Sequence, residues 1–283
     1  MTDNNGTTRW PPYRHVFFDC DSTLTTVEGI DVLAEQAGRS EQVKLLTEAA
    51  MNGEVDLEDV YGERLAHIQP TRAQIQALRQ VYKDNAVADA AMVIAVLQHL
   101  GHQIYIISGG LEEPVREFGM SLGVPADHIR AVGVEYDELV GAWWSHHEGQ
   151  EANYLDYGRG ALAVSEGKEE IVHELKGSQP GASLLVGDGT SDLLAGEAVD
   201  LFVGFGGVAA RPKVEAGAPV FIRSAGLAPV LPIAAGPSAM ARLEETSYRA
   251  LFWEGIVRGQ DATTFNDATL GVTFGEAVAG AGL

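Results

Sequence analysis

The sequence predicts an α/β protein with a doubly wound, Rossmann-like parallel sheet and a small all-helical cap inserted after the first strand. Two observations carry this prediction. Short apolar runs that end in polar or glycine-rich loops alternate with segments of helical periodicity, which is typical of parallel sheets with helices on both faces. Between the first two such runs lies a long stretch with helical periodicity alone, and this stretch indicates the insert.

The first predicted strand is the run His15-Val16-Phe17-Phe18, which is β-branched and aromatic and therefore suits burial on both faces of a sheet. From Ile30 to about Tyr82 the apolar residues recur at helical spacing, with breaks at Asn52-Gly53 and Gln69-Pro70. We therefore divide the chain into three parts: an α/β core of residues 13–27 and 86–235, a helical cap of residues 28–85 and a C-terminal helical extension of residues 236–283.

The alternation of helices and strands resumes after Val87. The sequence predicts helices around residues 90–100, 114–122 and 167–175, and strands around residues 103–107, 129–134, 183–186, 201–203 and 220–222. The segment from Asp137 to Tyr157 fits this pattern poorly and is interpreted as a hairpin or an excursion off the core. Beyond Ile233, residues 241–256 again show helical spacing.

Composition restricts the function classes. The 283 residues include 40 Asp and Glu against 19 Lys and Arg, a net charge of −21 that repels nucleic acid and anionic membranes, so neither is an expected partner. The apolar runs are far shorter than the roughly 20 residues of a membrane span. A single cysteine, Cys20, allows no intrachain disulfide and indicates the reducing cytoplasm. The stretch from Met1 to Pro12 is polar, lacks the features of a signal peptide and is predicted to be a frayed tail.

Polar side chains follow three of the predicted strands. Asp19 and Asp21 follow the first strand, Ser108 follows the second, and Asp188 and Asp192 follow the strand around residues 183–186. Because ligands of open α/β sheets bind at the carboxyl ends of the strands, we expect these side chains to converge. Four carboxylates in one site repel each other unless a cation lies between them, and oxygen donors favour Mg²⁺.

These residues supply each group that phosphoryl transfer requires. Asp19 is the candidate nucleophile, and Asp21 can protonate the leaving oxygen and later activate water. The hydroxyl of Ser108 and the amide of Gly109 can hold phosphoryl oxygens, while Lys168 can neutralise the phosphate and Asp19. The expected partner is therefore a small phosphorylated metabolite.

The motifs also resemble a known family. Asp19-x-Asp21-x-Thr23, Ser108, Lys168 and Gly187-Asp188-x3-Asp192 occur in the order found in haloacid-dehalogenase-like phosphohydrolases, and the resemblance covers about residues 14–222. It implies Mg²⁺-dependent hydrolysis of a phosphomonoester through an aspartyl-phosphate at Asp19. It also implies that Asp19, Asp188 and Asp192 bind the Mg²⁺ ion, with Asp21 contributing its backbone carbonyl.

Within this family, the segment from Asp19 to Thr25 followed by Glu28-Gly29-Ile30-Asp31 is similar to the phosphoserine phosphatase group. The resemblance implies that Glu28 receives the substrate ammonium and that Arg64 receives its carboxylate, a pair that would recognise the zwitterion of O-phospho-L-serine. Ser191 departs from the pattern, because the group usually has Asn at this position near the phosphate. The identity of the substrate therefore stays open.

Several alternatives remain at this point. The same chemistry could act on another small phosphomonoester or pass the phosphoryl group to an alcohol, or the acidic cleft could hold a cation without catalysis. Glu28 could be a charge at a helix start, and Arg64 could pair with the acidic face around Asp56, Glu58 and Asp59. The stretch from Val134 to Ser165 and the extension beyond Ile233 could reshape the entrance or form the contact of a homodimer.

Overall fold

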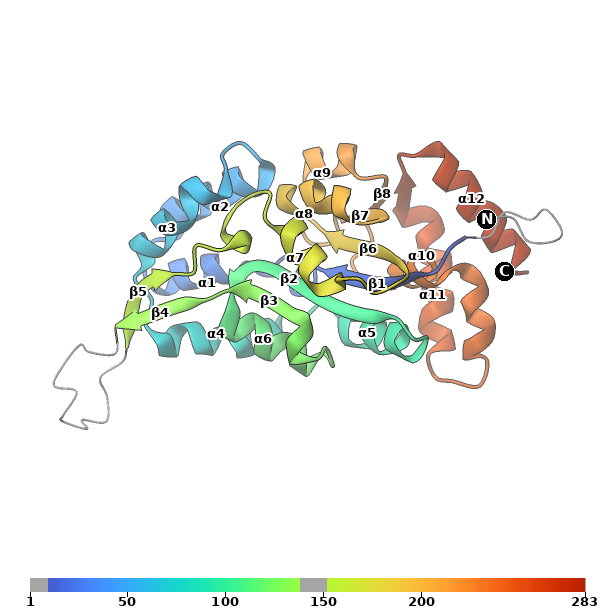
Figure 1. Cartoon of the computed structure of the whole chain (residues 1–283), viewed down its shortest axis with the longest axis horizontal. Helices are drawn as coiled ribbons and strands as arrows, with labels where there is room; N and C mark the ends of the chain where they lie inside the picture. Colours follow the sequence, from blue (N-terminus) through green and yellow to red (C-terminus); the bar gives the residue numbers. More distant parts are fainter. Residues whose placement is uncertain (1–9, 138–151, 283) are drawn as a thin grey trace.

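A seven-stranded sheet forms the centre of the computed structural model, which describes residues 10–137 and 152–282 (Figure 1). The strand order is β3-β2-β1-β6-β7-β8-β9, in which the first six strands are parallel and β9 is antiparallel to β8. The strands are β1 (Tyr13–Phe18), β2 (Gln103–Leu111), β3 (Ile129–Val132), β6 (Ala182–Gly187), β7 (Leu201–Phe205), β8 (Val220–Ile222) and β9 (Thr263–Phe265). The predicted parallel, doubly wound core is confirmed, with one antiparallel strand added at an edge.

The order of the strands reverses between β1 and β6, since β2 and β3 continue on one side and β7 and β8 on the other. Such a switch point leaves a crevice at the carboxyl ends of the two central strands. Asp19 follows β1 directly, and Asp188 follows β6 directly. The topology alone therefore brings these two carboxylates to the place where an open α/β sheet binds its ligand.

Side chains of the central strands alternate between two apolar cores. Val16 and Phe18 pack into one core, whereas Phe17 packs into the other, as the two-residue period of a strand requires. The first core contains residues from α5 (Ala90–His99), α6 (Glu112–Ser121), α10 (Val230–Ala235) and α11 (Arg249–Ala262). The second contains residues from α7 (Lys168–Lys176), α8 (Thr190–Ala195) and α9 (Pro212–Gly217). Cys20 is buried in the first core.

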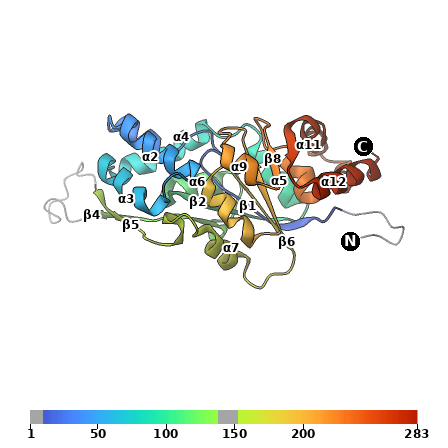
Figure 2. The same ribbon diagram turned by 90° about the horizontal axis from the view of Figure 1, so that it is seen from above.

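Four helices lie between β1 and α5 and form a helical insert at one end of the molecule (Figures 1 and 2). They are α1 (Gly29–Gln36), α2 (Ser40–Asn52), α3 (Leu57–Ile68) and α4 (Arg72–Asp84). Gly53 ends α2 with a φ of +69°, a conformation that favours glycine, and Thr71 starts α4 with a capping box. The apolar face of the insert continues into the second core, so the insert packs on the sheet.

The segment that fitted the alternation poorly pairs its two ends as an antiparallel ladder between β4 (Val134–Asp137) and β5 (Asn153–Tyr157). Residues 138–151 lie outside the described residues. Strand β5 attaches the ladder to the insert, because Tyr154 N donates to the carbonyl of Pro70 over 3.0 Å and the ring of Tyr157 packs, tilted by 37°, against that of Tyr61 with the centroids 4.9 Å apart. The excursion is therefore a second connection between the core and the insert.

The C-terminal part differs from the expected run of helix over residues 241–256. A 3₁₀ helix covers Pro237–Leu243, α11 begins only at Arg249, and β9 is followed by α12 (Ala268–Gly280). Leu243 and Phe252 are both fully buried, yet nine residues of one straight helix would place them on opposite faces, so the chain must break between them. The remaining 3₁₀ helices are Ala126–His128, Ala161–Ala163 and Gly196–Ala198.

The expectation of a frayed tail up to Pro12 is wrong at Trp10, which is buried. Its indole Nε1 donates to the carbonyl of Ile233 over 2.7 Å, and its rings make edge contacts with Phe265 and Phe274 at 6.4 and 5.0 Å. A hydrophobic and polar anchor of this kind explains why the chain is ordered there. Within residues 10–137 and 152–282, no helix has the length and apolar character to cross a membrane.

Candidate active site

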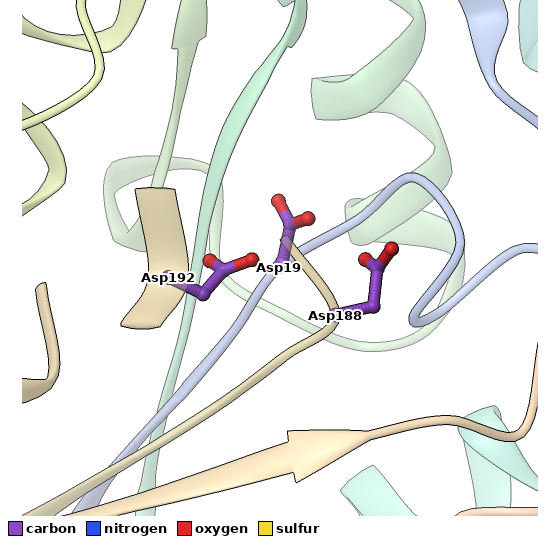
Figure 3. A group of neighbouring side chains, drawn as sticks. All are labelled: Asp19, Asp188 and Asp192. Atoms are coloured by element: carbon purple, nitrogen blue, oxygen red, sulfur yellow. The ribbon is translucent and has the colours of Figure 1, made fainter. Parts of the chain in front are cut away.

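Three carboxylates converge at the switch point of the sheet. One oxygen from each of Asp19, Asp188 and Asp192 lies within 4.8 Å of the others, and all three side chains are buried. Figure 3 shows them projecting from the end of β1, from the loop after β6 and from the first turn of α8 into one shared space. The convergence that the sequence predicts for these residues is therefore present in the fold.

Lys168 lies within this carboxylate cluster. Its Nζ is 2.8 Å from Asp19 Oδ1 and 2.6 Å from Asp192 Oδ1, and the side chain is buried. Burial alone lowers the pKa of a lysine, but here the two carboxylates outweigh burial and raise the pKa of Lys168 above its usual value. Lys168 therefore remains charged and fixes the orientation of Asp19.

The cluster nevertheless holds more negative charge than Lys168 can balance. Burial and the neighbouring Asp192 raise the pKa of Asp19 to about 7, even though Lys168 opposes this shift. Burial and the charge of Glu28 likewise raise the pKa of Asp21 and of Asp188. Raised carboxylate pKa values on three neighbouring residues indicate a site that lacks positive charge.

Ser108 and the two following glycines lie at the end of β2, which continues to Leu111 rather than ending before Ser108. Ser108 Oγ accepts a hydrogen bond of 2.9 Å from the amide of Gly110. A Cβ atom at Gly110 would lie 2.9 Å from Asp21 Oδ2 and 3.1 Å from Ser108 Oγ, so a side chain there would crowd both groups. The glycine keeps the backbone and the two polar side chains within reach of one small ligand.

The predicted site residues surround a single cavity of about 40 Å³, enough for a few water molecules. Residues of the sheet edge and of the insert both contribute to it. The lining consists of Asp19, Asp21, Glu28, Ile30, Met51, Leu57, Tyr61, Arg64, Ser108, Gly109, Gly110, Leu111, Lys168 and Ser191. Of the predicted residues, only Asp188 and Asp192 lie behind this lining, next to Asp19.

Arg64 extends from α3 into this cavity. The side chain is buried, Nη1 donates to Thr47 Oγ1 over 3.3 Å, and the guanidinium stacks 5.3 Å from the ring centroid of Tyr61. Arg64 Nε has no hydrogen-bond partner in the described part of the chain. Within the described residues, no ion pair joins Arg64 to Asp56, Glu58 or Asp59. The alternative that Arg64 pairs with this acidic face of the insert is therefore not what the fold shows.

Glu28 also lines the cavity and is held by two groups of the core. Ser22 Oγ donates to Glu28 Oε1 over 2.7 Å, and Arg211 Nη2 lies 3.5 Å from the same oxygen. Ser191 also lines the cavity, while its neighbour Thr190 donates to the carbonyl of Met51 over 3.0 Å and joins the core to the insert. The core and the insert therefore both contribute residues around the cavity.

Two residues of the site were missed by the sequence reasoning. Arg211 Nε lies 3.0 Å from Asp188 Oδ2, and Tyr61 donates to the carbonyl of Gly109 over 2.9 Å. Arg211 could have been found by the rule that located Asp188, since it lies in the connection after the next parallel strand, β7. Tyr61 lies three residues before Arg64 on α3, and residues at this spacing share a helix face.

Comparison with known proteins agrees with this geometry. The family model of haloacid dehalogenase-like hydrolases matches residues 16–197. A phosphoserine phosphatase of Homo sapiens is 31% identical over 208 residues, which cover 73% of this chain and 88% of the relative. A phosphoserine phosphatase of Drosophila melanogaster is 31% identical over 201 residues, which cover 70% of each chain.

Solved structures share the fold. A phosphoserine phosphohydrolase-like protein from Francisella tularensis superposes with a TM-score of 0.66 at 22% identity, covering 75% of this chain and 96% of that one. A substrate-bound phosphoserine phosphatase complex also superposes with a TM-score of 0.66 at 22% identity, covering 77% and 97%. The chain therefore belongs to the haloacid dehalogenase-like hydrolase family, and it is a phosphatase.

Proposed function

We propose that this phosphatase hydrolyses O-phospho-L-serine to L-serine and phosphate. The observation that carries the proposal is the buried guanidinium of Arg64, whose Nε has no partner among the described residues and which lines the same cavity as Asp19 and Asp21. A buried, incompletely paired guanidinium favours a carboxylate ligand, because the fork of N–H donors matches two carboxylate oxygens. Glu28, which lines the same cavity, supplies the negative charge that an ammonium group needs.

In the proposed reaction, an Asp19 oxygen attacks the phosphorus atom and the bond between phosphorus and the serine oxygen breaks. Asp21 gives its proton to the leaving alkoxide, which departs as the serine hydroxyl. Asp21 then takes a proton from water as the water oxygen attacks the aspartyl-phosphate, so that phosphate leaves and Asp19 is restored. The raised pKa of Asp21 suits a group that must carry a proton in the first step.

The phosphoryl oxygens require donors and positive charge during both steps. The hydroxyl of Ser108, the amide of Gly109 and the ammonium of Lys168 all line the cavity beside Asp19. Donors that are fixed before the reaction stabilise developing charge without the cost of reorganising water. We assign phosphate binding to these three groups and the orientation of Asp19 to Lys168.

We also propose that the site holds Mg²⁺ through Asp19, Asp188 and Asp192, with the backbone carbonyl of Asp21 as a further oxygen donor. The excess of buried negative charge and the purely oxygen donor set suit this ion. When bound, Mg²⁺ would neutralise charge on the phosphate and on Asp19. In the absence of such charge compensation, Asp19 with a pKa near 7 is only partly ionised at neutral pH.

The helical insert, residues 28–85, is proposed to act as a cap that opens for substrate and product. The cavity of about 40 Å³ lies between the sheet edge and the insert, so movement of the insert would widen it for a phosphorylated amino acid. Opening would break polar contacts such as Thr190 to the carbonyl of Met51 and Leu57 N to Ser165 Oγ at 2.8 Å, together with part of the apolar packing between the insert and the sheet. A cap of this kind would exclude water during turnover.

The test is phosphate release from a panel: O-phospho-L-serine, O-phosphothreonine, phosphoethanolamine, a phosphosugar and an aryl phosphate, each with Mg²⁺ or with EDTA. We expect Mg²⁺-dependent turnover with the highest kcat/KM on O-phospho-L-serine, and no turnover with the Asp19→Asn variant. Phosphoethanolamine lacks the carboxylate, so its low kcat/KM would assign recognition to that group. A higher kcat/KM on another substrate would contradict the proposed specificity and leave the phosphatase chemistry in place.

A further inference from the structure

Residues 108–110 form an irregular segment near the end of β2 and line the cavity. The pairing of β2 with β1 ends before this segment, and its pairing with β3 shifts register between Ile107 and Leu111. The peptide groups of the segment therefore lie outside the regular ladder, and peptide groups removed from water need partners from elsewhere. Two side chains supply such partners: Ser108 itself and Tyr61, which belongs to α3 of the insert.

One peptide group of this segment is held at both ends. The hydroxyl of Tyr61 donates to the carbonyl of Gly109 over 2.9 Å, and the amide of Gly110 donates to Ser108 Oγ over 2.9 Å. This carbonyl and this amide belong to the same planar peptide unit, so a contact that fixes the carbonyl also fixes the direction of the N–H group. The Tyr61 hydroxyl therefore orients a peptide whose N–H group points at Ser108.

The orientation of this peptide decides what the Ser108 hydroxyl can do. A serine hydroxyl has one proton to donate and two lone pairs that accept. The oxygen of Ser108 accepts from Gly110, and within the described part of the chain its proton is donated to no other group. Ser108 is buried and lines the cavity together with Asp19, so a phosphoryl oxygen bound there is a suitable acceptor for this proton.

Tyr61 is itself held by aromatic and cationic neighbours. The side chain is buried, and the guanidinium of Arg64 stacks 5.3 Å from its ring centroid. The ring of Tyr157 on β5 packs against that of Tyr61 at 4.9 Å, and a Cβ atom at Gly62 would lie 3.0 Å from Tyr157 Cε1. Because Tyr61 belongs to α3, its hydroxyl reaches Gly109 only while the insert is docked on the sheet.

We propose that Tyr61 is a positioning residue for the phosphate-binding segment, residues 108–110: its hydroxyl holds the peptide between Gly109 and Gly110 so that Ser108 donates to a phosphoryl oxygen. The inference rests on the proposed role of Ser108 in phosphate binding and does not depend on which phosphomonoester is cleaved. Because Tyr61 lies on the insert, the phosphate site is complete only when the insert is docked. Phosphate binding and docking of the insert therefore favour each other.

The test compares Tyr61→Phe with the wild type, using the full chain with Mg²⁺. The probe is inorganic phosphate, the product that every phosphomonoester shares, measured as a competitive inhibitor. The substitution keeps the ring and removes one neutral hydrogen bond, so we expect Ki for phosphate to rise about five- to tenfold. The value of kcat/KM should fall by a similar factor for O-phospho-L-serine and for p-nitrophenyl phosphate, because the two substrates have the phosphoryl group in common.

Tyr157→Phe is the matched control, because the ring of Tyr157 packs against Tyr61 but does not line the cavity. It should leave Ki and both kcat/KM values within about twofold of the wild type. An unchanged Ki for phosphate in Tyr61→Phe would overturn the inference. A loss confined to O-phospho-L-serine would also overturn it, since Tyr61 would then act through Arg64 and not through the phosphate-binding segment.

The proposed specificity can fail without affecting this test. If the wild type turns over O-phospho-L-serine poorly, that result contradicts the proposed substrate alone. Ki for phosphate and kcat/KM for p-nitrophenyl phosphate still decide the role of Tyr61, since neither measurement involves the amino acid part of a substrate.

Hydrogen exchange gives a measurement that does not depend on turnover. In the wild type with Mg²⁺, saturating inorganic phosphate should slow amide exchange in α3, because bound phosphate favours the docked insert. In Tyr61→Phe this protection should be weaker, at a phosphate concentration raised to match the higher Ki. Equal protection in the two proteins, or none in the wild type, would overturn the coupling between the phosphate site and the insert.

Discussion

Arg211 Nε lies 3.0 Å from Asp188 Oδ2, and its Nη2 lies 3.5 Å from Glu28 Oε1, so one guanidinium joins a proposed Mg²⁺ ligand to the proposed ammonium site. Both ion pairs are largely buried. Losing one member of a buried pair leaves the other charge uncompensated, which is more costly than the loss of a surface pair. The guanidinium therefore carries part of the positive charge that the carboxylate cluster requires.

We predict that Arg211→Met destabilises the metal-free enzyme by roughly 3 kcal/mol. Saturating Mg²⁺ should recover most of this loss, because the ion supplies positive charge next to Asp188. The measurement is Tm in EDTA and in Mg²⁺. Arg223→Met, which removes an exposed ion pair with Glu215, is the control and should give the same small shift in both buffers. An equal Tm loss for Arg211→Met in both buffers would contradict the prediction.

The stability of the metal-free enzyme should depend on pH through Asp19. Its pKa is about 7 in the folded protein, against about 3.9 in the unfolded chain, so between these values the folded state binds more protons. Stability therefore falls as pH rises from about 4 to 7, by up to about 1.4 kcal/mol per pH unit from this group. In EDTA, the Tm of the wild type should decrease between pH 5 and pH 8 more steeply than that of Asp19→Asn; parallel slopes would rule out Asp19 as the cause.

Lys168 and Asp19 should be indispensable for turnover. Asp19→Asn removes the nucleophile and is expected to abolish phosphate release. Lys168→Ala leaves Asp19 and Asp192 without their shared ammonium and should reduce kcat by about 10²- to 10³-fold, as for the loss of one charged donor in a preorganised site. Lys176→Ala on the same helix is the control, because Lys176 pairs with Asp200 away from the cavity. Wild-type kcat in either site variant would refute the mechanism.

Arg64 should discriminate between substrates. Arg64→Met keeps the aliphatic part of the side chain but removes the guanidinium, so KM for O-phospho-L-serine should rise about 10- to 100-fold, since a charge-assisted hydrogen bond contributes roughly 1.5–3 kcal/mol. KM for p-nitrophenyl phosphate should stay within about twofold. Arg79→Met is the control, because Arg79 of α4 forms an exposed pair with Glu117 of α6. Equal KM changes on both substrates would make Arg64 a structural residue.

The four site aspartates that sequence reasoning located share one property: each follows a predicted strand within a few residues. Asp19 and Asp188 follow apolar runs whose strand identity is clear, and parallel strands bring their carboxyl ends to one edge. Tyr61 reaches the same site through packing between segments that are far apart in the sequence. Its position depends on how the insert docks on the sheet, which no local pattern records.

The C-terminal part of the chain also contains elements that local sequence patterns could not predict. Strand β9 has only three residues, Thr263–Phe265, which is too short for an alternating pattern to predict it. It pairs with β8 because Phe265 and Phe274 pack against Trp10, a residue more than 250 positions away. Tertiary contacts therefore decide both the extra strand and the break before α11, and helical periodicity over residues 241–256 could indicate neither.

Trp10 is the residue through which this terminal packing can be tested. The indole is 3% exposed, donates to the carbonyl of Ile233 and contacts rings from both β9 and α12. Trp10→Ala should therefore lower the free energy of unfolding by about 3–5 kcal/mol, because it removes a large buried side chain and leaves a cavity. The measurement is urea unfolding in the presence of Mg²⁺.

The matched control is Trp253→Ala, since Trp253 lies on α11 with 44% of its surface exposed and should cost less than about 1 kcal/mol. KM for O-phospho-L-serine should not change in Trp10→Ala under conditions where the variant is folded, because Trp10 does not line the cavity. If the two tryptophan variants unfold at the same urea concentration, the N-terminal strand does not depend on the C-terminal segment. If KM changes in Trp10→Ala alone, the terminal packing reaches the active site through β1, whose end carries Asp19.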